Sequence, residues 1–512
     1  MNQAISREVE ETTELALHEK SKLVKSLSRF DMVGFTVCAF VGLDTLGTVA
    51  SNGGQGFTWL VVLAVVFVLP YGLLMAEVGS AFTQEGGPYE WSKMAFGRLQ
   101  GAIAAVLYWV TNPLWVGGSL AFIATDSWRA NVFDIGHGTF GDYLFKFIFI
   151  WISIGVAIVS LRQGKWIPNV GAFMRIFVLG FFTITVIIYG IEHGFAGFSA
   201  SDLSPTRAVF LGLVPVLLFN YVGFELQNGA AEEMEDPQKD VPLSVLRSGI
   251  LGVLLYVIPI GGIILVLPTE DVTGIGGFID AVTKTFSVYG GAAHTLLILM
   301  TICFVGTLVT SGAVWMIGSD RIQAVAAYDG AFFPWFGVFN RRFGTPVRVN
   351  VMSGIVSTIF CFSAIAFFDS GEDATFQIVL DIAISTTLIS YIWIFLAALR
   401  LRYTHPEVER PYRVPLGTAG IWIGSLLITG WVLLGSWVAV FPGTLEKVFD
   451  VPYDFVDNWG VGRGRFEVYT LATLGIILAF GLVGYWAGRD VRKQIVATQV
   501  QVVEPADPVP SV

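Results

Sequence analysis

The chain has 512 residues, of which 54% are apolar and 14% charged, whereas a soluble globular chain is roughly 25% charged. This composition excludes an ordinary soluble enzyme and favours a bundle of membrane helices. The formal charge of -10, from 30 basic and 40 acidic residues, argues against nucleic-acid binding, which requires a basic face. The cysteines and histidines show no metal-ligand spacing, and nucleotide, zinc and serine-hydrolase motifs are missing. We therefore expect neither a metal, a cofactor nor an enzymatic activity.

Long apolar stretches fill most of the chain. A bilayer core needs about 20 apolar residues per helix, and we count about twelve such stretches. They begin near Asp31, Phe57, Gly101, Tyr143, Asn169, Ala208, Ser248, Ala292, Val349, Phe376, Gly417 and Phe466. The expected fold is an all-α membrane protein that lies in a lipid bilayer and crosses it about twelve times.

The basic residues are distributed unevenly over the connecting segments. When the N-terminal tail, every second loop and the C-terminal tail are assigned to one side, that side collects 23 of the 30 Lys and Arg residues. Arg175, in the fifth stretch, is included in this count. Positive charge is retained in the cytoplasm, so we expect a multi-pass protein of the plasma (inner) membrane with both termini cytoplasmic. Residues 1–30 and 491–512 would form the two tails, the second one disordered.

Two apolar stretches share a pattern in which a glycine interrupts the run and an acidic residue follows two positions later. The first stretch contains Val41-Gly42-Leu43-Asp44, and the sixth contains Val222-Gly223-Phe224-Glu225. A chance match is one explanation, but paired glycine-interrupted segments also indicate the binding site of a transporter built from inverted repeats. That interpretation predicts discontinuous helices one and six, repeats over residues 31–190 and 207–400, and two accessory helices over residues 417–490.

Three acidic residues, Asp44, Glu225 and Asp381, lie within apolar stretches. A carboxylate in the hydrocarbon region costs at least about 2.5 kcal/mol, so it normally faces a cavity or a partner. We expect these three to serve binding or coupling, although Asp381 could be a solvated carboxylate near a helix end. Glu77, late in the second stretch, is expected instead to be a structural partner of backbone or a basic residue. Asn112 fits substrate binding and helix–helix bonding equally well.

Four motifs, each at the matching stretch, resemble those of the APC (amino acid, polyamine and organocation) transporter superfamily. They are QEGGPYEWSKMAFG after the second stretch, FNYVGFELQNGAAEEMEDPQKDVP in the sixth, SDRIQAVAAYDGAFFPWFGVFNRRFGTPVRVN after the eighth and LRLRYTHPEVERPYRVPLG after the tenth. The resemblance covers most of the chain. It implies a five-plus-five inverted-repeat core and secondary transport of amino acids or amines by alternating access.

The resemblance also implies roles for single positions. Phe219 would close over the substrate, Glu225 would be the acidic position after the helix break, and Trp315 would be the gate of the eighth stretch. Asn112 would be a polar contact of the third. The chain departs from the family at VGLDTLG, where many members carry a GSG-like run that binds a substrate carboxylate. It also lacks the lysine of the fifth stretch that some proton-coupled members use.

The leading hypothesis is a transporter of amino acids or amines with a site on the two interrupted helices. The candidate substrate-binding residues are Gly42, Asp44, Thr45, Asn112, Phe219, Tyr221, Glu225, Trp315 and Ser385. Aromatic faces attract ammonium groups, and buried carboxylates can pair with a substrate nitrogen or carry a proton. We favour proton coupling through Asp44, Glu225 or Asp381; sodium bound by Thr310 and Ser311, or exchange without a coupling ion, are alternatives. An ion channel is a remote alternative, and a homodimer is left open.

Overall fold

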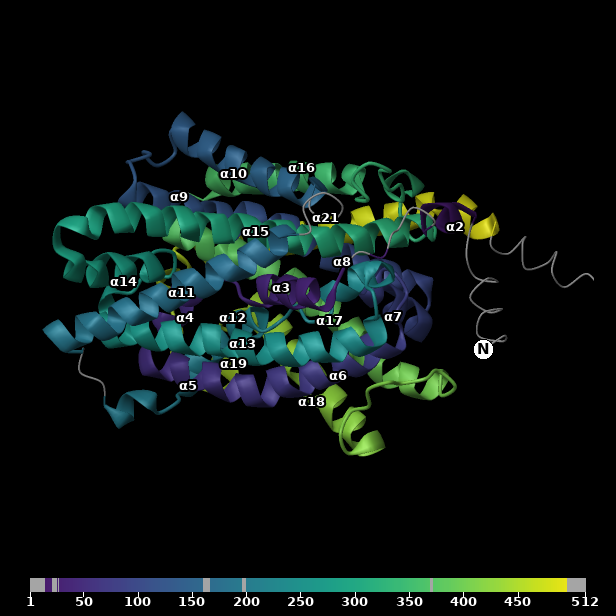
Figure 1. Cartoon of the computed structure of the whole chain (residues 1–512), viewed down its shortest axis with the longest axis horizontal. Helices are drawn as coiled ribbons and strands as arrows, with labels where there is room; N and C mark the ends of the chain where they lie inside the picture. The colour runs from purple at the N-terminus through teal and green to yellow at the C-terminus, as the bar shows by residue number, and fades with distance from the viewer. Residues whose placement is uncertain are drawn as a thin grey trace, which may run out of the picture.

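The computed structural model describes residues 14–20, 25, 27–159, 166–195, 199–368 and 372–494. Within these ranges the chain forms helices, and the one β-type pairing is an isolated bridge between Leu27 and Met234. Most helices run along the long axis of the molecule (Figure 1). The all-α membrane fold is therefore confirmed. The tail predicted to be disordered lies, from residue 495 on, outside the described residues.

Ten helical segments in the described ranges are long and apolar enough to cross a membrane. Seven are single helices: α10 (Phe140–Val159), α11 (Trp166–His193), α13 (Pro237–Val266), α16 (Val347–Phe367), α17 (Glu372–Thr404), α18 (Gly417–Val440) and α21 (Arg463–Ala487). Three are composite: α5 (Gly53–Leu63) with η1 (Ala64–Val68) and α6 (Leu69–Ala81); α8 (Arg98–Trp115) with η2 (Val116–Leu120) and α9 (Ala121–Asn131); and α14 (Gly277–Thr285) with η6 (Phe286–Ala292) and α15 (Ala293–Tyr328).

The first and sixth predicted spans are each broken into two helices. The first consists of α3 (Arg29–Phe40) and α4 (Leu46–Ala50), and the sixth of α12 (Arg207–Asn220) and the 3-10 helix η4 (Leu226–Glu233). At the second break Gly223 has a φ of 129°, a conformation that only glycine adopts readily. The discontinuity of both helices is thus confirmed. The boundaries of the two repeats stay a prediction.

Short helices lie in the connections between the spans. They are α2 (Glu14–Lys20), α7 (Gly87–Phe96), η3 (Ala200–Leu203), η5 (Thr269–Asp271), η7 (Pro334–Phe336), α19 (Thr444–Val448) and α20 (Phe455–Trp459). Helices α2 and α7 lie at one end of the bundle, on the right of Figure 1, and α14 at the other. The helices begin within a few residues of the predicted starts of the stretches, except that α13 begins at Pro237 rather than near Ser248. Its first turns are polar, so the apolar pattern missed them.

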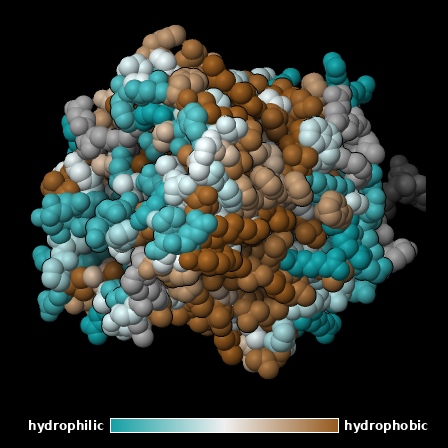
Figure 2. Space-filling model, turned by 60° about the vertical axis from the view of Figure 1, so that its left-hand side comes forward, coloured by the Kyte–Doolittle hydropathy of each residue, from teal (hydrophilic) through white to brown (hydrophobic). Residues whose placement is uncertain are grey.

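Burial divides the helices into an inner and an outer group. Apolar side chains on α10, α11, α13, α18 and α21 are exposed, including Ile152, Phe173, Ile250, Ile423 and Ile476. Figure 2 shows hydrophobic side chains gathered over the middle of one face, with hydrophilic ones to either side. Such an apolar surface suits a lipid environment. In contrast, α8 is buried throughout its apolar part, and it carries several of the side chains at the candidate site.

Candidate functional site

The two helix breaks border one small central cavity. Its lining consists of Ala39, Phe40, Gly42, Asp44, Thr45, Thr111, Asn112, Trp115, Phe219, Asn220, Tyr256 and Trp315. The cavity measures about 20 Å³, which is room for about one water molecule. An organic substrate therefore fits only after the surrounding helices or side chains move apart.

Asp44 is the acidic residue of this cavity. One of its carboxylate oxygens, Oδ2, accepts hydrogen bonds from Trp115 Nε1 and Ser119 Oγ, each at 2.6 Å. The other oxygen, Oδ1, has no partner among the described residues, although the side chain is almost fully buried. A buried oxygen without a donor is costly, and no Lys, Arg or His lines the cavity. The arrangement therefore suits a ligand that brings its own hydrogen-bond donor or positive charge.

Aromatic rings and one free amide complete the cavity. The ring of Trp115 lies 6.0 Å from Phe219 and 6.3 Å from Trp315, measured between centroids. Trp315 Nε1 donates to the Ala39 carbonyl oxygen at 2.8 Å, which ties α15 to the end of α3. Both polar atoms of the Asn220 side chain lack a partner in the described part of the chain. The cavity thus offers aromatic faces, a carboxylate and an amide together.

At both breaks, tyrosine hydroxyls accept hydrogen bonds from backbone amides. The Gly42 amide donates to Tyr256 Oη at 2.8 Å. At the second break, the amides of Gly223 and Phe224 donate to Tyr71 Oη at 2.9 and 3.0 Å. Exposed amides at a helix break would be natural ligands of an anion. Here a substrate carboxylate would first have to displace a tyrosine.

Glu225 lies behind the second break and does not line the central cavity. Its carboxylate accepts hydrogen bonds from Tyr108 at 2.6 Å, from Tyr391 at 2.5 Å and from Tyr71. These tyrosines belong to α8, α17 and α6, so the carboxylate joins three spans to η4. The three phenolic donors satisfy a fully buried carboxylate without a basic residue.

The other predicted site residues are divided between the central cavity and the surrounding structure. Gly42, Asp44, Thr45, Asn112, Phe219 and Trp315 line the cavity. Tyr221 instead donates to the Leu60 carbonyl oxygen at 3.0 Å, and Ser385 donates to Ile382 within its own helix at 2.8 Å. Asp381 lines a separate cavity. The sequence analysis missed Trp115 and Tyr256 because this chain is rich in aromatic residues. It missed Asn220 because this residue belongs to neither repeated pattern.

Arg175 is a buried residue beside the first break that the sequence analysis misplaced. It was counted with the cations of one membrane side, but its side chain is fully buried within α11. Its guanidinium lies within hydrogen-bond distance of six acceptors: the carbonyl oxygens of Val41, Gly171 and Thr307, the hydroxyls of Thr310 and Ser311, and the sulfur of Cys38. Two of these are the hydroxyls considered for sodium. A single charged residue in an apolar stretch was the available signal.

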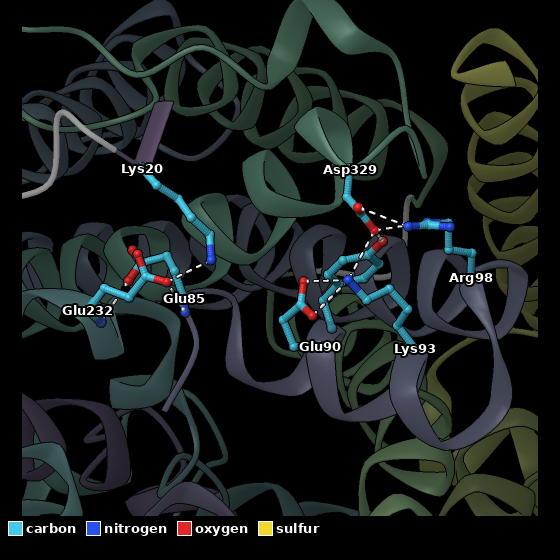
Figure 3. A network of polar contacts seen from close by, with 8 residues as sticks. Lys20, Glu85, Glu90, Lys93, Arg98, Glu232 and Asp329 are labelled. Atoms are coloured by element: carbon cyan, nitrogen blue, oxygen red, sulfur yellow. Dashed lines mark hydrogen bonds and ion pairs between the residues drawn. The ribbon is translucent and has the colours of Figure 1, made fainter. Parts of the chain in front are cut away.

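A buried ion cluster closes the end of the bundle that carries α2. Arg321, on α15, donates to Glu85 at 2.7 Å and to Glu233 at 2.9 Å. Lys20 bonds Glu232 at 2.8 Å, and the Glu232 amide donates to Glu85 (Figure 3). Burial raises the pKa of Glu85 from 4.5 to about 8; Arg321 opposes the shift, and the nearby Glu233 and Glu232 add to it.

A second cluster surrounds Asp329, just after α15. Tyr89 donates to its carboxylate at 2.6 Å, Arg98 at 3.1 Å and Lys93 at 3.2 Å (Figure 3). Burial raises the pKa of Asp329, but Lys93 and Arg98 outweigh it, so the pKa lies below its usual value. The two clusters together hold α2, α7, α8, η4 and α15 against one another at this end.

Glu77 is a structural residue, as expected. It accepts hydrogen bonds from Arg402 and from the Val414 amide, the latter at 2.7 Å, and lies 3.4 Å from Arg410. It thereby links α6 to the connection between α17 and α18.

Known families and proteins resemble this chain over most of its length. The amino acid permease family matches residues 27–448. The chain belongs to this family, within the APC superfamily. A probable agmatine/putrescine antiporter of Lactococcus lactis is 31% identical over 402 residues, which are 78% of this chain and 84% of the relative.

Two further relatives extend the comparison. An uncharacterized transporter of Legionella pneumophila is 27% identical over 400 residues, or 77% of this permease and 84% of the relative. A glutamate/gamma-aminobutyrate antiporter of Lactococcus lactis is 21% identical over 475 residues, or 88% of each chain. The family and these relatives are transporters rather than enzymes, so the expected membrane transporter of amino acids or polyamines is confirmed.

Proposed function

We propose that this permease is an antiporter of organic amines that carry positive charge and no carboxylate, such as diamines and guanidino-amines. The observation that carries the proposal is Asp44, with one oxygen lacking a partner in a buried cavity that no described basic residue lines. An ammonium or guanidinium group supplies the missing donor and the opposite charge. The rings of Trp115, Phe219 and Trp315 add attraction for a desolvated cation.

Amino acids fit this site less well. The Gly42 amide is bonded to Tyr256, and the amides of Gly223 and Phe224 to Tyr71, so three break amides are not free for an α-carboxylate. An ionised Asp44 would also repel a carboxylate. The agmatine/putrescine relative supports amines, whereas the more distant glutamate/gamma-aminobutyrate relative keeps amino acids as the second candidate.

Sodium is not needed in this mechanism. The hydroxyls of Thr310 and Ser311 accept from the guanidinium of Arg175, together with carbonyl oxygens of Val41 and Thr307. A fixed cation therefore takes the ligands that Na⁺ would require. Exchange of one amine for another fits this arrangement best. We assign any proton-dependent step to Glu225, which is buried among three tyrosines.

The positive-charge bias supports an inner-membrane protein with both termini in the cytoplasm. In that orientation the clusters around Arg321 and Asp329 close the cytoplasmic end. Alternating access would then open these clusters while the opposite end closes over the loaded site. A homodimer stays a prediction of the sequence analysis.

Counterflow in proteoliposomes tests the proposal. Purified permease is reconstituted into liposomes loaded in turn with unlabelled putrescine, agmatine, arginine, glutamate or gamma-aminobutyrate, and counterflow of the same labelled compound is measured in sodium-free buffer. We expect saturable exchange of putrescine or agmatine and none of glutamate. Liposomes without protein are the control for leak. Exchange of glutamate without exchange of either amine would overturn the proposal.

A further inference from the structure

A second cavity lies beyond the central one, toward the end of the bundle away from α2. It measures about 180 Å³, against about 20 Å³ for the central cavity. Its walls come from α4, α12, the first turns of α17, the end of α18 and the connection that carries α19 and α20. We call it the vestibule cavity.

The vestibule cavity contains two carboxylates without partners. Asp381 is 6% exposed and Glu446 is 2% exposed. Asp381 Oδ2 and Glu446 Oε2 form no hydrogen bond with any described residue. No Lys, Arg or His belongs to the lining. Two buried carboxylate oxygens without donors in one cavity are costly, so they indicate a ligand that brings donors and positive charge.

Two basic residues at the ends of this connection, Arg463 and Lys447, do not line the cavity. Arg463 bonds Glu467 at 3.3 Å and lies over the ring of Phe455, 4.8 Å from its centroid. Lys447, next to Glu446, is exposed. Neither cation forms a salt bridge with Asp381 or Glu446 in the described structure, so neither carboxyl group is directly paired with them.

Aromatic side chains stand beside the two carboxylates. Tyr453 lines the cavity, and its hydroxyl accepts a hydrogen bond from Trp459 Nε1 at 2.6 Å. Burial raises the pKa of Tyr453 to about 12; the bond from Trp459 and the charge of Arg463 oppose this shift, while Glu446 and Asp381 add to it. Both carboxylates are therefore close enough to Tyr453 to influence the pKa of its hydroxyl. Faces of Tyr and Trp next to carboxylates are the usual surroundings of a bound organic cation.

The two cavities follow each other along the same helices. Thr45 lines the central cavity and Thr48 the vestibule cavity, and the same holds for Phe219 and Val216 on α12. A spacing of three residues is slightly less than one helical turn, or about 4.5 Å. A ligand in the vestibule cavity therefore lies directly next to the central site.

We propose that Asp381 and Glu446 form a second binding site for the ammonium or guanidinium group of an organic cation, from which the central cavity is loaded. The identity of the ligand rests on the proposed function, whereas the site itself rests on the two carboxylates. Because the central cavity holds Asp44 separately, one chain binds two cations. The vestibule site raises the local substrate concentration, and Asp44 binds the substrate during the transport step.

Equilibrium binding of labelled putrescine to the purified permease in nanodiscs tests this proposal. Wild type is expected to bind two molecules per chain, and Asp44→Asn and the double variant Asp381→Asn/Glu446→Gln one each. Asp457→Asn removes an exposed carboxylate of the same connection that does not line the cavity, so it should still bind two. Glu446→Gln alone should raise the putrescine concentration for half-maximal exchange at least about tenfold at low ionic strength.

The results separate this proposal from the proposed function. One binding site in wild type, with exchange unaffected by the double variant, overturns the vestibule site and leaves amine exchange standing. Absence of amine counterflow together with one putrescine bound to Asp44→Asn refutes the proposed function but retains the vestibule site. If the double variant fails to fold, two measurements still test the vestibule site. They are the number of putrescine molecules bound per wild-type chain and the putrescine concentration for half-maximal exchange by Glu446→Gln.

Discussion

Arg175 donates from Nε to the carbonyl oxygen of Val41 at 3.0 Å, so the fifth span holds the first one at the residue where its helix breaks. A break in a membrane helix frees carbonyl groups that must be satisfied within the protein. Arg175 does this with a permanent charge, since a guanidinium does not lose its proton under ordinary conditions. The first break is therefore stabilised without a bound ion.

The rate of amine exchange should be the same in sodium and in potassium buffers. Arg175→Ala removes the hydrogen bonds from the guanidinium, and leaving a buried acceptor such as the Val41 carbonyl oxygen unsatisfied costs at least about 1 kcal/mol. We expect a lower midpoint of thermal unfolding in detergent and loss of exchange. Arg247→Ala, at an exposed position, is the matched control. A sodium requirement in wild type would contradict the role of Arg175.

Asp44→Asn should weaken amine binding while the fold is kept. The amide keeps an oxygen for the donors Trp115 and Ser119 but loses the negative charge. We expect the half-saturating putrescine concentration to rise at least about tenfold, equivalent to about 1.4 kcal/mol. Ser119→Ala, which removes one donor to Asp44, should have a smaller effect. Unchanged half-saturation in Asp44→Asn would place the substrate elsewhere.

The sequence alone predicted both breaks because a glycine and an acidic residue repeat at the same spacing in two spans. It could not tell on which side of the break each carboxylate lies. Asp44 faces the cavity, whereas Glu225 turns away to three tyrosines, which depends on packing against α6, α8 and α17. The buried position of Arg175 was not predicted, because basic residues were assigned to a side of the membrane by the order of the loops alone.

Glu225→Gln should slow exchange without weakening putrescine binding. The carboxylate accepts from three phenols, and Tyr71 already accepts from the amides of Gly223 and Phe224. A glutamine would direct its own donors at these phenols, so the cluster loses at least one bond. We expect the maximal exchange rate to fall at least about tenfold.

Tyr108→Phe removes one of the three donors to Glu225 and should reduce the exchange rate less than Glu225→Gln does. Both variants are compared with wild type by equilibrium binding and by initial rates of exchange. A loss of putrescine affinity in Glu225→Gln as large as that in Asp44→Asn would show that Glu225 contacts the substrate after all.

Acid should favour closure of the end that carries α2. Burial raises the pKa of Glu85 from 4.5 to about 8, so between these values the closed cluster holds a proton that an exposed Glu85 releases. The closed state is thus stabilised as pH falls from 8 and destabilised as it rises.

A cysteine-free chain with Ser92→Cys, a buried position on α7, should be alkylated more slowly at pH 6 than at pH 8. The rates are taken relative to Lys239→Cys, which is exposed, to correct for the thiol's own titration. Glu85→Gln should remove this pH dependence, and persistence of the full pH dependence in that variant would assign the proton to another group.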